Sequence, residues 1–140
     1  MGQLSDPVIA RWRGSFTNEE ANFLHALAFR TRVFTEAEWN WVDLTDRHSL
    51  GWVTARSGDL LVGFVNVVWD GLVHAWIQDL MVHPDHQHRG IGTRVITEAT
   101  AGARAAGCEW LHVDFDDEHR DFYFGACGFP PTNAGLLRLQ

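Results

Sequence analysis

The chain has 140 residues and a mass of 15.8 kDa, the size of one ordinary domain, so we expect residues 1–140 to form a single domain. Its 46% hydrophobic content against 21% charged residues excludes a disordered chain, because that much apolar surface can offset the entropy of ordering. The 11 basic residues are all arginine and are outnumbered by 18 acidic ones, and the resulting net charge of -7 argues against nonspecific binding to nucleic acid.

Three patterns that are absent from the sequence bear on the cellular compartment of the protein. No segment approaches the ~20 apolar residues of a membrane-spanning helix, and residues 1–6 lack the charged and apolar pattern of a signal peptide. Cys108 and Cys127 have neither metal-site spacing nor a disulfide framework around them. We therefore expect a cytoplasmic protein without a membrane partner, in which both cysteines are small buried hydrophobic residues.

The first third of the chain predicts one strand and two helices. Residues 8–13 alternate apolar and polar side chains and end at a glycine, which is typical of a short strand. Thr17 can cap a helix that continues to about Arg30 with apolar residues at helical spacing. Thr35, with Glu38 three residues later, forms a second capping-box pattern. It predicts a shorter helix that ends near His48.

Three strands then follow, separated by turn residues. They are predicted over 52–56, 60–69 and 72–82, with turns at 57–59 and 70–71. The second turn is Asp-Gly, a strong signal for a hairpin between apolar strands. The three strands should therefore form an antiparallel meander.

The last third predicts two more helices and two more strands. Residues 90–106 carry an apolar stripe at helical spacing and stop at a glycine, and 110–115 alternate as a half-buried strand does. The helical crossover makes this strand parallel to the one before it. A helix over 118–126 and a terminal strand over 136–139 complete a mixed α/β fold.

A glycine-rich loop is the most informative segment of the chain. It follows the strand that ends at Val82, and Gly90 and Gly92, one residue apart, open the next helix. Such glycines let backbone N–H groups approach an anion, and the helix dipole favours negative charge there. The loop therefore predicts a pyrophosphate site, with a simple tight turn as the alternative. A Rossmann fingerprint is excluded because Val95 occupies its third glycine position, and a Walker loop is excluded because the chain has no lysine.

The segment Gln87-His88-Arg89-Gly90-Ile91-Gly92 resembles the acyl-CoA-binding motif Gln/Arg-x-x-Gly-x-Gly/Ala of the GNAT N-acetyltransferases. Three other segments also resemble that family in order and spacing: Leu80-x-Val82-x-Pro84, Leu61-Val62-Gly63 and Cys127-Gly128-Phe129. The resemblance covers about residues 8–139. It implies a GNAT-like domain with a mixed, mostly antiparallel sheet flanked by helices and splayed at the acyl-CoA site. The implied activity is transfer of an acetyl group from acetyl-CoA to a primary amine.

The resemblance also implies which residues bind acetyl-CoA. The loop amides would bind its pyrophosphate, and the preceding strand would pair its main chain with the pantetheine arm. The implied cofactor-binding residues are Met81, Val82, Gln87, His88, Arg89, Gly90, Ile91, Gly92, Thr93 and Asp117. We expect no metal, although His83, Asp85, His86 and His88 crowd this loop, because zinc sites have regular ligand spacing with a distant second pair.

Acetyl transfer to an amine requires a base for the ammonium and an acid for the leaving thiolate. Asp79 is the only acid on the strand that precedes the loop and is the first candidate for the base, with Asp114 second and Glu118 third. A purely structural role for Asp79 is the alternative. The family often carries a tyrosine as the acid at the position of Phe124, whereas the only tyrosine here is Tyr123, one residue earlier. Either a local irregularity turns Tyr123 into the site, or Tyr123 is a core residue and water is the acid.

The acceptor is expected to be a small-molecule or peptide amine. The resemblance places Trp39, Trp41 and Trp76 where the family forms its acceptor site. A homodimer is expected from the general frequency of dimers among soluble enzymes. Two other functions stay open: an acyl-CoA-binding module of the same fold without the reaction, and a structural protein that uses exposed aromatic residues as an interaction surface.

Overall fold

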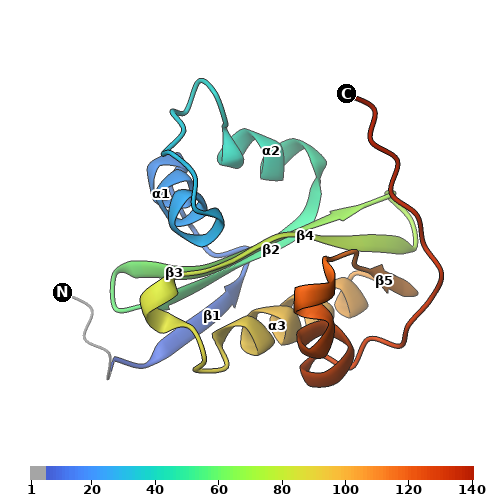
Figure 1. Ribbon diagram of the computed structural model, residues 1–140. Coiled ribbons are helices and arrows are strands. Elements are labelled where there is room, and N and C mark those ends of the chain that lie inside the picture. Colours follow the sequence, from blue (N-terminus) through green and yellow to red (C-terminus); the bar gives the residue numbers. More distant parts are fainter. Residues whose placement is uncertain (1–5) are drawn as a thin grey trace.

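The computed structural model describes residues 6–140, and these residues form one five-stranded sheet with helices on both faces (Figure 1). Residues 1–5, on which the signal-peptide expectation depends, lie outside the described residues. The strands lie in chain order, β1 Val8–Trp12, β2 Ser49–Ser57, β3 Leu60–Trp69, β4 His74–Val82 and β5 Trp110–His112. Strands β1 to β4 pair antiparallel with one another, and β5 pairs parallel with β4. The predicted meander and mixed sheet are confirmed.

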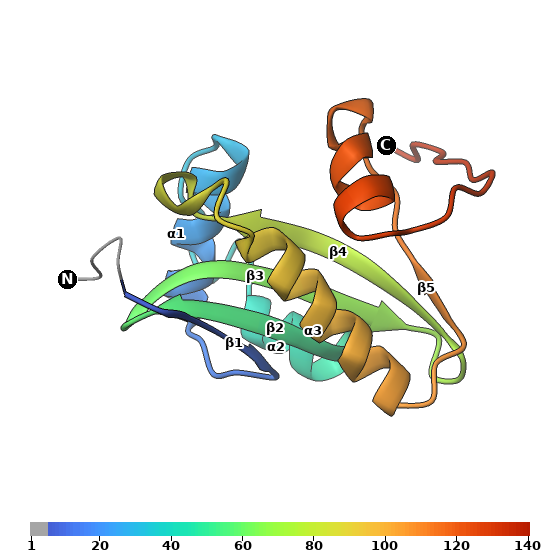
Figure 2. The ribbon, with the colours of Figure 1, turned by 90° about the horizontal axis from the view of Figure 1, so that it is seen from below.

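Helices α1 (Asn18–Phe29) and α2 (Trp41–His48) cover one face of this sheet. Helix α3 (Ile91–Ala105) crosses the other face, and a π-helix over Asp121–Ala126 lies on the same side (Figure 2). None of the helices within residues 6–140 is long and apolar enough to span a membrane. The apolar residues of α3 pack with the sheet in one core cluster, and those of α1 and α2 pack with it in a second.

The N-terminal ends of the first two helices differ in how well their caps were predicted. Thr17 forms the expected capping box, in which its side chain accepts from the N–H of Glu20 and the Glu20 carboxylate accepts from the N–H of Thr17. Thr35 makes the same reciprocal bonds with Glu38, but they close an isolated turn. The prediction of a helix start at Thr35 is wrong, since α2 begins six residues later under the side-chain cap of Asn40.

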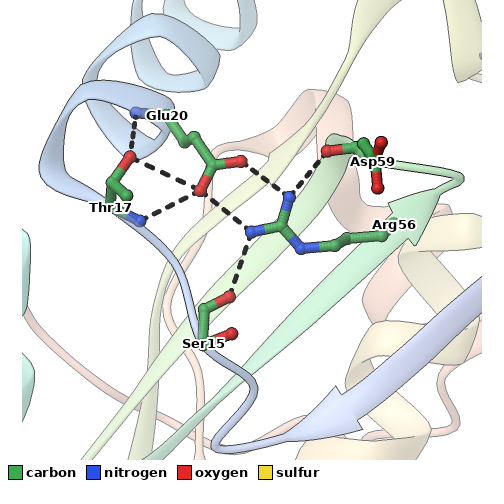
Figure 3. A network of polar contacts seen from close by, with 5 residues as sticks. All are labelled: Ser15, Thr17, Glu20, Arg56 and Asp59. Atoms are coloured by element: carbon green, nitrogen blue, oxygen red, sulfur yellow. Dashed lines mark hydrogen bonds and ion pairs between the residues drawn. The ribbon is translucent and has the colours of Figure 1, made fainter. Parts of the chain in front are cut away.

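A polar network ties the start of α1 to the sheet (Figure 3). Arg56 on β2 donates two hydrogen bonds to the carboxylate of Glu20, at 2.6 and 2.9 Å. It also donates to the main-chain oxygens of Ser15 and Asp59, at 3.0 and 2.8 Å. Both charged side chains are about two-thirds or more buried. The bonds to Arg56 lower the pKa of Glu20, as expected for a carboxylate held by a bidentate guanidinium.

The end of the chain differs from the prediction. Residues 136–139 form no strand, and Leu136, Leu137 and Leu139 are 82–87% exposed. The β5 strand also ends at His112, before the predicted end at Phe115, and nothing in the described residues pairs with its outer edge. An alternating pattern becomes a strand only where the segment pairs with a sheet edge. The three residues of β5 offer only a short edge, and residues 136–139 do not pair with it. The terminal-strand prediction is therefore wrong.

The two cysteines lie at the border of the α3-side core. Cys108 and Cys127 are partly buried and pack against that core. Burial raises the pKa of both thiols, that of Cys127 to about 11. Such thiols remain protonated near neutral pH, which fits their expected packing role.

Candidate active site

A bulge in β4 places Asp79 in an unusual backbone conformation. Phe64 on β3 pairs with Met81 and Asn66 pairs with Gln78, so two β4 residues face one residue of β3. Asp79 takes the extra position with a φ of +59°. Left-handed backbone is uncommon for a residue with a side chain and often marks a functional site.

A cavity of about 230 Å³ opens where β4 and β5 separate. The two strands pair through three residue pairs only, from His74–Trp110 to Trp76–His112. In Figure 2 the chain after β5 leaves the sheet and rises toward the π-helix. The residues that line the cavity are Ile77–Leu80, Val113, Asp114 and Tyr123. The three candidate catalytic residues, Asp79, Asp114 and Tyr123, thus meet in one place, whereas Glu118 does not line it.

The charged side chains that line this cavity are all acidic. It contains two carboxylates, Asp79 and Asp114, and no arginine or histidine. Burial raises the pKa of Asp79 above its usual 3.8, and an interaction with His25 on α1 opposes this rise. A carboxylate that is desolvated without a cationic partner in the cavity wall favours binding of a cation or a proton.

The π-helix explains how the tyrosine reaches the cavity. The N–H of Cys127 bonds to the oxygen of Phe122, five residues back, so the turn holds one residue more than an α-helical turn. A local irregularity of the kind considered in the sequence analysis is therefore present, and Tyr123 is at the same time a buried core residue with 7% exposure. Tyr123 lines the cavity and stacks on Phe115 with ring centroids 4.7 Å apart, whereas Phe124 packs edge-on against Phe115 outside it. Burial raises the pKa of Tyr123 to about 12, so its hydroxyl keeps its proton near neutral pH.

The glycine-rich loop presents open backbone at the start of α3. Gly90, the N-cap, has a φ of +76°, and a Cβ added there would meet nothing within 4 Å. No side chain caps this helix end, and the first intrahelical bond runs from Arg94 to Gly90, so the amides of residues 91–93 have no acceptor within the helix. The loop also holds His88 at a φ of +62°. These amides and the room beside Gly90 fit an anionic group such as a phosphate.

Other expected cofactor residues lie around this loop with different surroundings. A Cβ on Gly92 would come within 3.1 Å of the Phe122 ring, so Gly92 serves packing of the π-helix against α3. The Met81 side chain is buried on the α1 side of the sheet, which leaves only its main chain for a ligand. Val82 is partly buried, and Asp117 is exposed in a 3-10 turn over Asp117–His119.

The tryptophans divide into core and surface positions. Trp41 is 1% exposed, and its indole N–H donates to the side chain of buried Asn22. The expectation that Trp41 lines the acceptor site is corrected by this position, because a fully buried ring packs the core. Trp39 is 46% exposed, and Trp76 is half-buried and stacks on His112 at 4.8 Å. Both remain able to contact a ligand.

The loop histidines do not assemble around a common point. His86 is 4% exposed and packs edge-on against His83, and both of its ring nitrogens are buried without a hydrogen-bond partner. The N–H of Asp85 donates to the His83 ring. Within residues 6–140 no group of three or more His, Cys, Asp or Glu is arranged to hold a metal ion.

Two histidine features were missed in the sequence analysis. His25, on α1, packs against the rings of Phe29 and Trp41, and the charge of Asp79 raises its pKa against the effect of burial. His74 and His112 lie on adjacent strands with ring nitrogens 2.7 Å apart. No local signal marks either feature, since each depends on residues far apart in the sequence.

These elements define an α/β fold in which acid–base side chains meet between two diverging strands, beside an uncapped helix N-terminus. The model of the Acetyltransferase (GNAT) family matches residues 14–129. The chain therefore belongs to the GNAT acetyltransferase family, as its sequence motifs predicted. A comparison with curated proteins found no match.

Solved structures share the fold at low sequence identity. A GNAT family acetyltransferase from Streptococcus pneumoniae is 23% identical, with 96% of this chain and 98% of that chain covered and a TM-score of 0.72. The aminoglycoside acetyltransferase AAC(6')-Iy, in complex with a bisubstrate analogue of CoA, is 14% identical over 96% and 98% of the two chains, with a TM-score of 0.75. Glucosamine-6-phosphate N-acetyltransferase from Arabidopsis thaliana is 15% identical over 96% and 99%, with a TM-score of 0.71.

Proposed function

We propose that this protein transfers an acetyl group from acetyl-CoA to a primary amine, by direct attack of the amine on the thioester. The observation that carries the proposal is the meeting of Asp79, Asp114 and Tyr123 in one cavity. A structural relative bound to a bisubstrate analogue of CoA supports the choice of cofactor. Acetyl-CoA supplies the activated acetyl group when it is bound.

The residues for binding acetyl-CoA lie on β4 and at the start of α3. The amides of residues 91–93 and the open space beside Gly90 would receive its pyrophosphate. The β4 edge beyond Trp76 has no β5 partner, so its main-chain groups are available to the pantetheine arm. The main chain of β4 would thus bind the pantetheine arm, and the N-terminal end of α3 would bind the pyrophosphate.

Asp79 acts as the base, taking a proton from the substrate ammonium. A cation is attracted to a cavity wall that holds two carboxylates and no basic side chain. The raised pKa of Asp79 makes its carboxylate a better proton acceptor than that of an ordinary aspartate. The carboxylate is still ionised at pH values above this raised pKa. The extra residue of the bulge leaves main-chain N–H groups beside Asp79 outside the strand pairing, and these can stabilise the oxyanion.

Tyr123 acts as the acid. Its pKa of about 12 keeps the hydroxyl protonated throughout the neutral range, so it can donate to the leaving thiolate. Trp39 and Trp76 are the aromatic side chains that we assign to the acceptor side, where the apolar part of the amine would lie.

The test is release of free thiol from acetyl-CoA over a broad panel of primary amines. Asp79→Asn should lower kcat/KM by ~10²- to 10⁴-fold, the scale of general-base catalysis. Asp46→Asn, at an exposed position on α2, is the matched control and should have no effect. Because Asp79 works only when ionised and its pKa is raised, the wild-type rate should fall as the pH drops through that raised value.

Each other outcome has a defined meaning. A loss below tenfold for Asp79→Asn would assign the base to Asp114 or to water. Binding of acetyl-CoA without turnover of any amine would favour the acyl-CoA-binding module. Failure to bind any CoA species would favour a structural interaction protein.

A further inference from the structure

Two histidines and two tryptophans gather where β4 and β5 pair, and the mechanism above uses only one of the four. The register places His74 opposite Trp110 and Trp76 opposite His112. Nδ1 of His74 lies 2.7 Å from Nε2 of His112. Trp76 stacks on His112 with ring centroids 4.8 Å apart and an angle of 18° between the ring planes, and His74 lies 6.0 Å from the same indole. We call these four residues the His–Trp cluster.

The His–Trp cluster lies on the face of the sheet that carries α1 and α2. Ala75 and Ile77 on β4 and Leu111 on β5 pack into the core on the α3 side. Because successive side chains of a strand point to opposite faces, the cluster points away from α3. Trp110 is 61% exposed, and the other three members are only partly buried. This part of the face is therefore open to a ligand.

The cluster borders the candidate active-site cavity. Trp76 and His112 are the last pair before β4 and β5 separate, and the residues that follow them on both strands line the cavity. Gln78 lines the cavity and shares the face of Trp76, two residues further along β4. An extended strand advances about 3.3 Å per residue, so Trp76 lies roughly 10 Å along β4 from Asp79. An amine held at Asp79 and extended along β4 would therefore place its far end against the cluster.

The hydrogen bond between the two imidazoles fixes what they offer to a ligand. A neutral imidazole has one N–H donor and one acceptor nitrogen. If His74 donates from Nδ1, its Nε2 is an acceptor and Nδ1 of His112 is a donor; if His112 donates from Nε2, these two outer roles are exchanged. Within residues 6–140 neither outer nitrogen is bonded to another residue or buried without a partner. In either arrangement the pair thus presents one donor and one acceptor.

We propose that the His74–His112 pair binds a hydroxyl group at the far end of the acceptor, so that the preferred substrate is a primary amino alcohol. This inference rests on the proposed function, since it names the class of amine that is acetylated. A hydroxyl both donates and accepts, as the pair requires. A terminal ammonium only donates and a carboxylate only accepts, so either would leave one nitrogen of the pair without its partner. Trp76 would contact the apolar chain between the amine and the hydroxyl.

Amines matched in chain length test this substrate class. Aminohexanol, with its amine and hydroxyl at opposite ends, should have a kcat/KM about tenfold higher than that of hexylamine, the effect of one added hydrogen bond. Diaminohexane and aminohexanoic acid should not exceed hexylamine. Because roughly 10 Å separates the two ends of the site, chains of about four to eight carbons are compared, near pH 8 where an imidazole is neutral. Equal rates for amino alcohol and alkylamine at every length, or a preference for the diamine or the amino acid, would overturn the proposal.

A double substitution tests whether the two histidines carry the preference. His74→Phe with His112→Phe keeps two rings of similar size and removes their nitrogens. It should lower kcat/KM for aminohexanol about tenfold, to the level of hexylamine, and leave the rate with hexylamine unchanged. His48→Phe, at an exposed position on α2, is the control and should keep the preference. A preference retained in the double variant would also overturn the proposal.

Binding can be followed without the reaction. In NMR spectra of the protein, aminohexanol should shift the imidazole signals of His74 and His112, and hexylamine should shift them much less. Turnover of amines with neither these shifts nor the preference would refute the hydroxyl site and leave acetyl transfer standing. Hydroxyl-dependent shifts without turnover of any amine would refute acetyl transfer and support the site. Neither shifts nor turnover would refute both.

Discussion

Replacing Gly90 with alanine tests whether the open backbone at the start of α3 binds acetyl-CoA. Gly90 has a φ of +76°, and a left-handed conformation costs an L-residue roughly 1–2 kcal/mol. A chain of 140 residues has an unfolding entropy of about 0.3 kcal/mol per kelvin at a typical ~2.1 cal/mol/K per residue. Gly90→Ala should therefore lower the melting temperature by about 3–7 °C without ligand.

The effect of ligand separates binding from strain. Acetyl-CoA at 100 times its Kd should stabilise the wild type by about 2.7 kcal/mol, which corresponds to about 9 °C. Gly90→Ala should lose most of this shift, because its methyl group enters space that is empty within 4 Å in the protein alone. The measurement is differential scanning fluorimetry with and without acetyl-CoA.

Gly107 provides a matched control at the other end of the same helix. It also has a positive φ, +93°, and a Cβ there would meet nothing within 4 Å. Gly107→Ala should therefore lose a similar amount of intrinsic stability and keep the full ligand-induced shift. Equal shifts in Gly90→Ala and Gly107→Ala would refute the assignment of the loop as the pyrophosphate site.

Two further predictions concern the proposed acid, Tyr123, and the polar network at the start of α1. Tyr123→Phe should lower turnover ~10²-fold or more with acetyl-CoA binding retained, whereas Phe124→Tyr should leave the rate unchanged, because Phe124 packs on Phe115 outside the cavity; steady-state kinetics decide. Arg56→Gln should cost about 1–3 kcal/mol in denaturant unfolding at pH 7. Because the pKa of Glu20 is lowered, this difference should shrink as the pH falls below 4.5, and a pH-independent cost would contradict it.

Local sequence signals predicted most of the fold and failed where distant contacts decide. The Thr17 capping box, the Asp-Gly hairpin turn and the helix after the glycine loop formed as expected. The equivalent bonds at Thr35 closed only a turn, because the helix start is set by the Asn40 cap and by burial of Trp41 against the sheet. A capping pattern describes four residues, and tertiary packing determines whether a helix follows.

The candidate site was predictable in its residue types but not in its geometry. Asp79 was identifiable as the only acid on its strand, yet its left-handed backbone arises from a register shift against β3. His25 and Asp79 are also far apart in the sequence, so the sequence does not reveal that Asp79 affects the pKa of His25. Bulges and electrostatic pairs of this kind depend on how strands and helices pack, which periodicity does not encode.

The π-helix links the proposed acid, Tyr123, to the proposed cofactor loop. Its extra residue turns Tyr123 into the cavity, and the preceding Phe122 then lies where a Cβ on Gly92 would come within 3.1 Å of its ring. A glycine is therefore favoured at each of the two motif positions for a different physical reason. Gly90 provides a left-handed turn with open space beside it, and Gly92 allows close contact with Phe122 of the π-helix. A side chain at position 92 would press on Phe122, the residue before Tyr123, so a substitution there would disturb the proposed acid as well as the proposed cofactor loop.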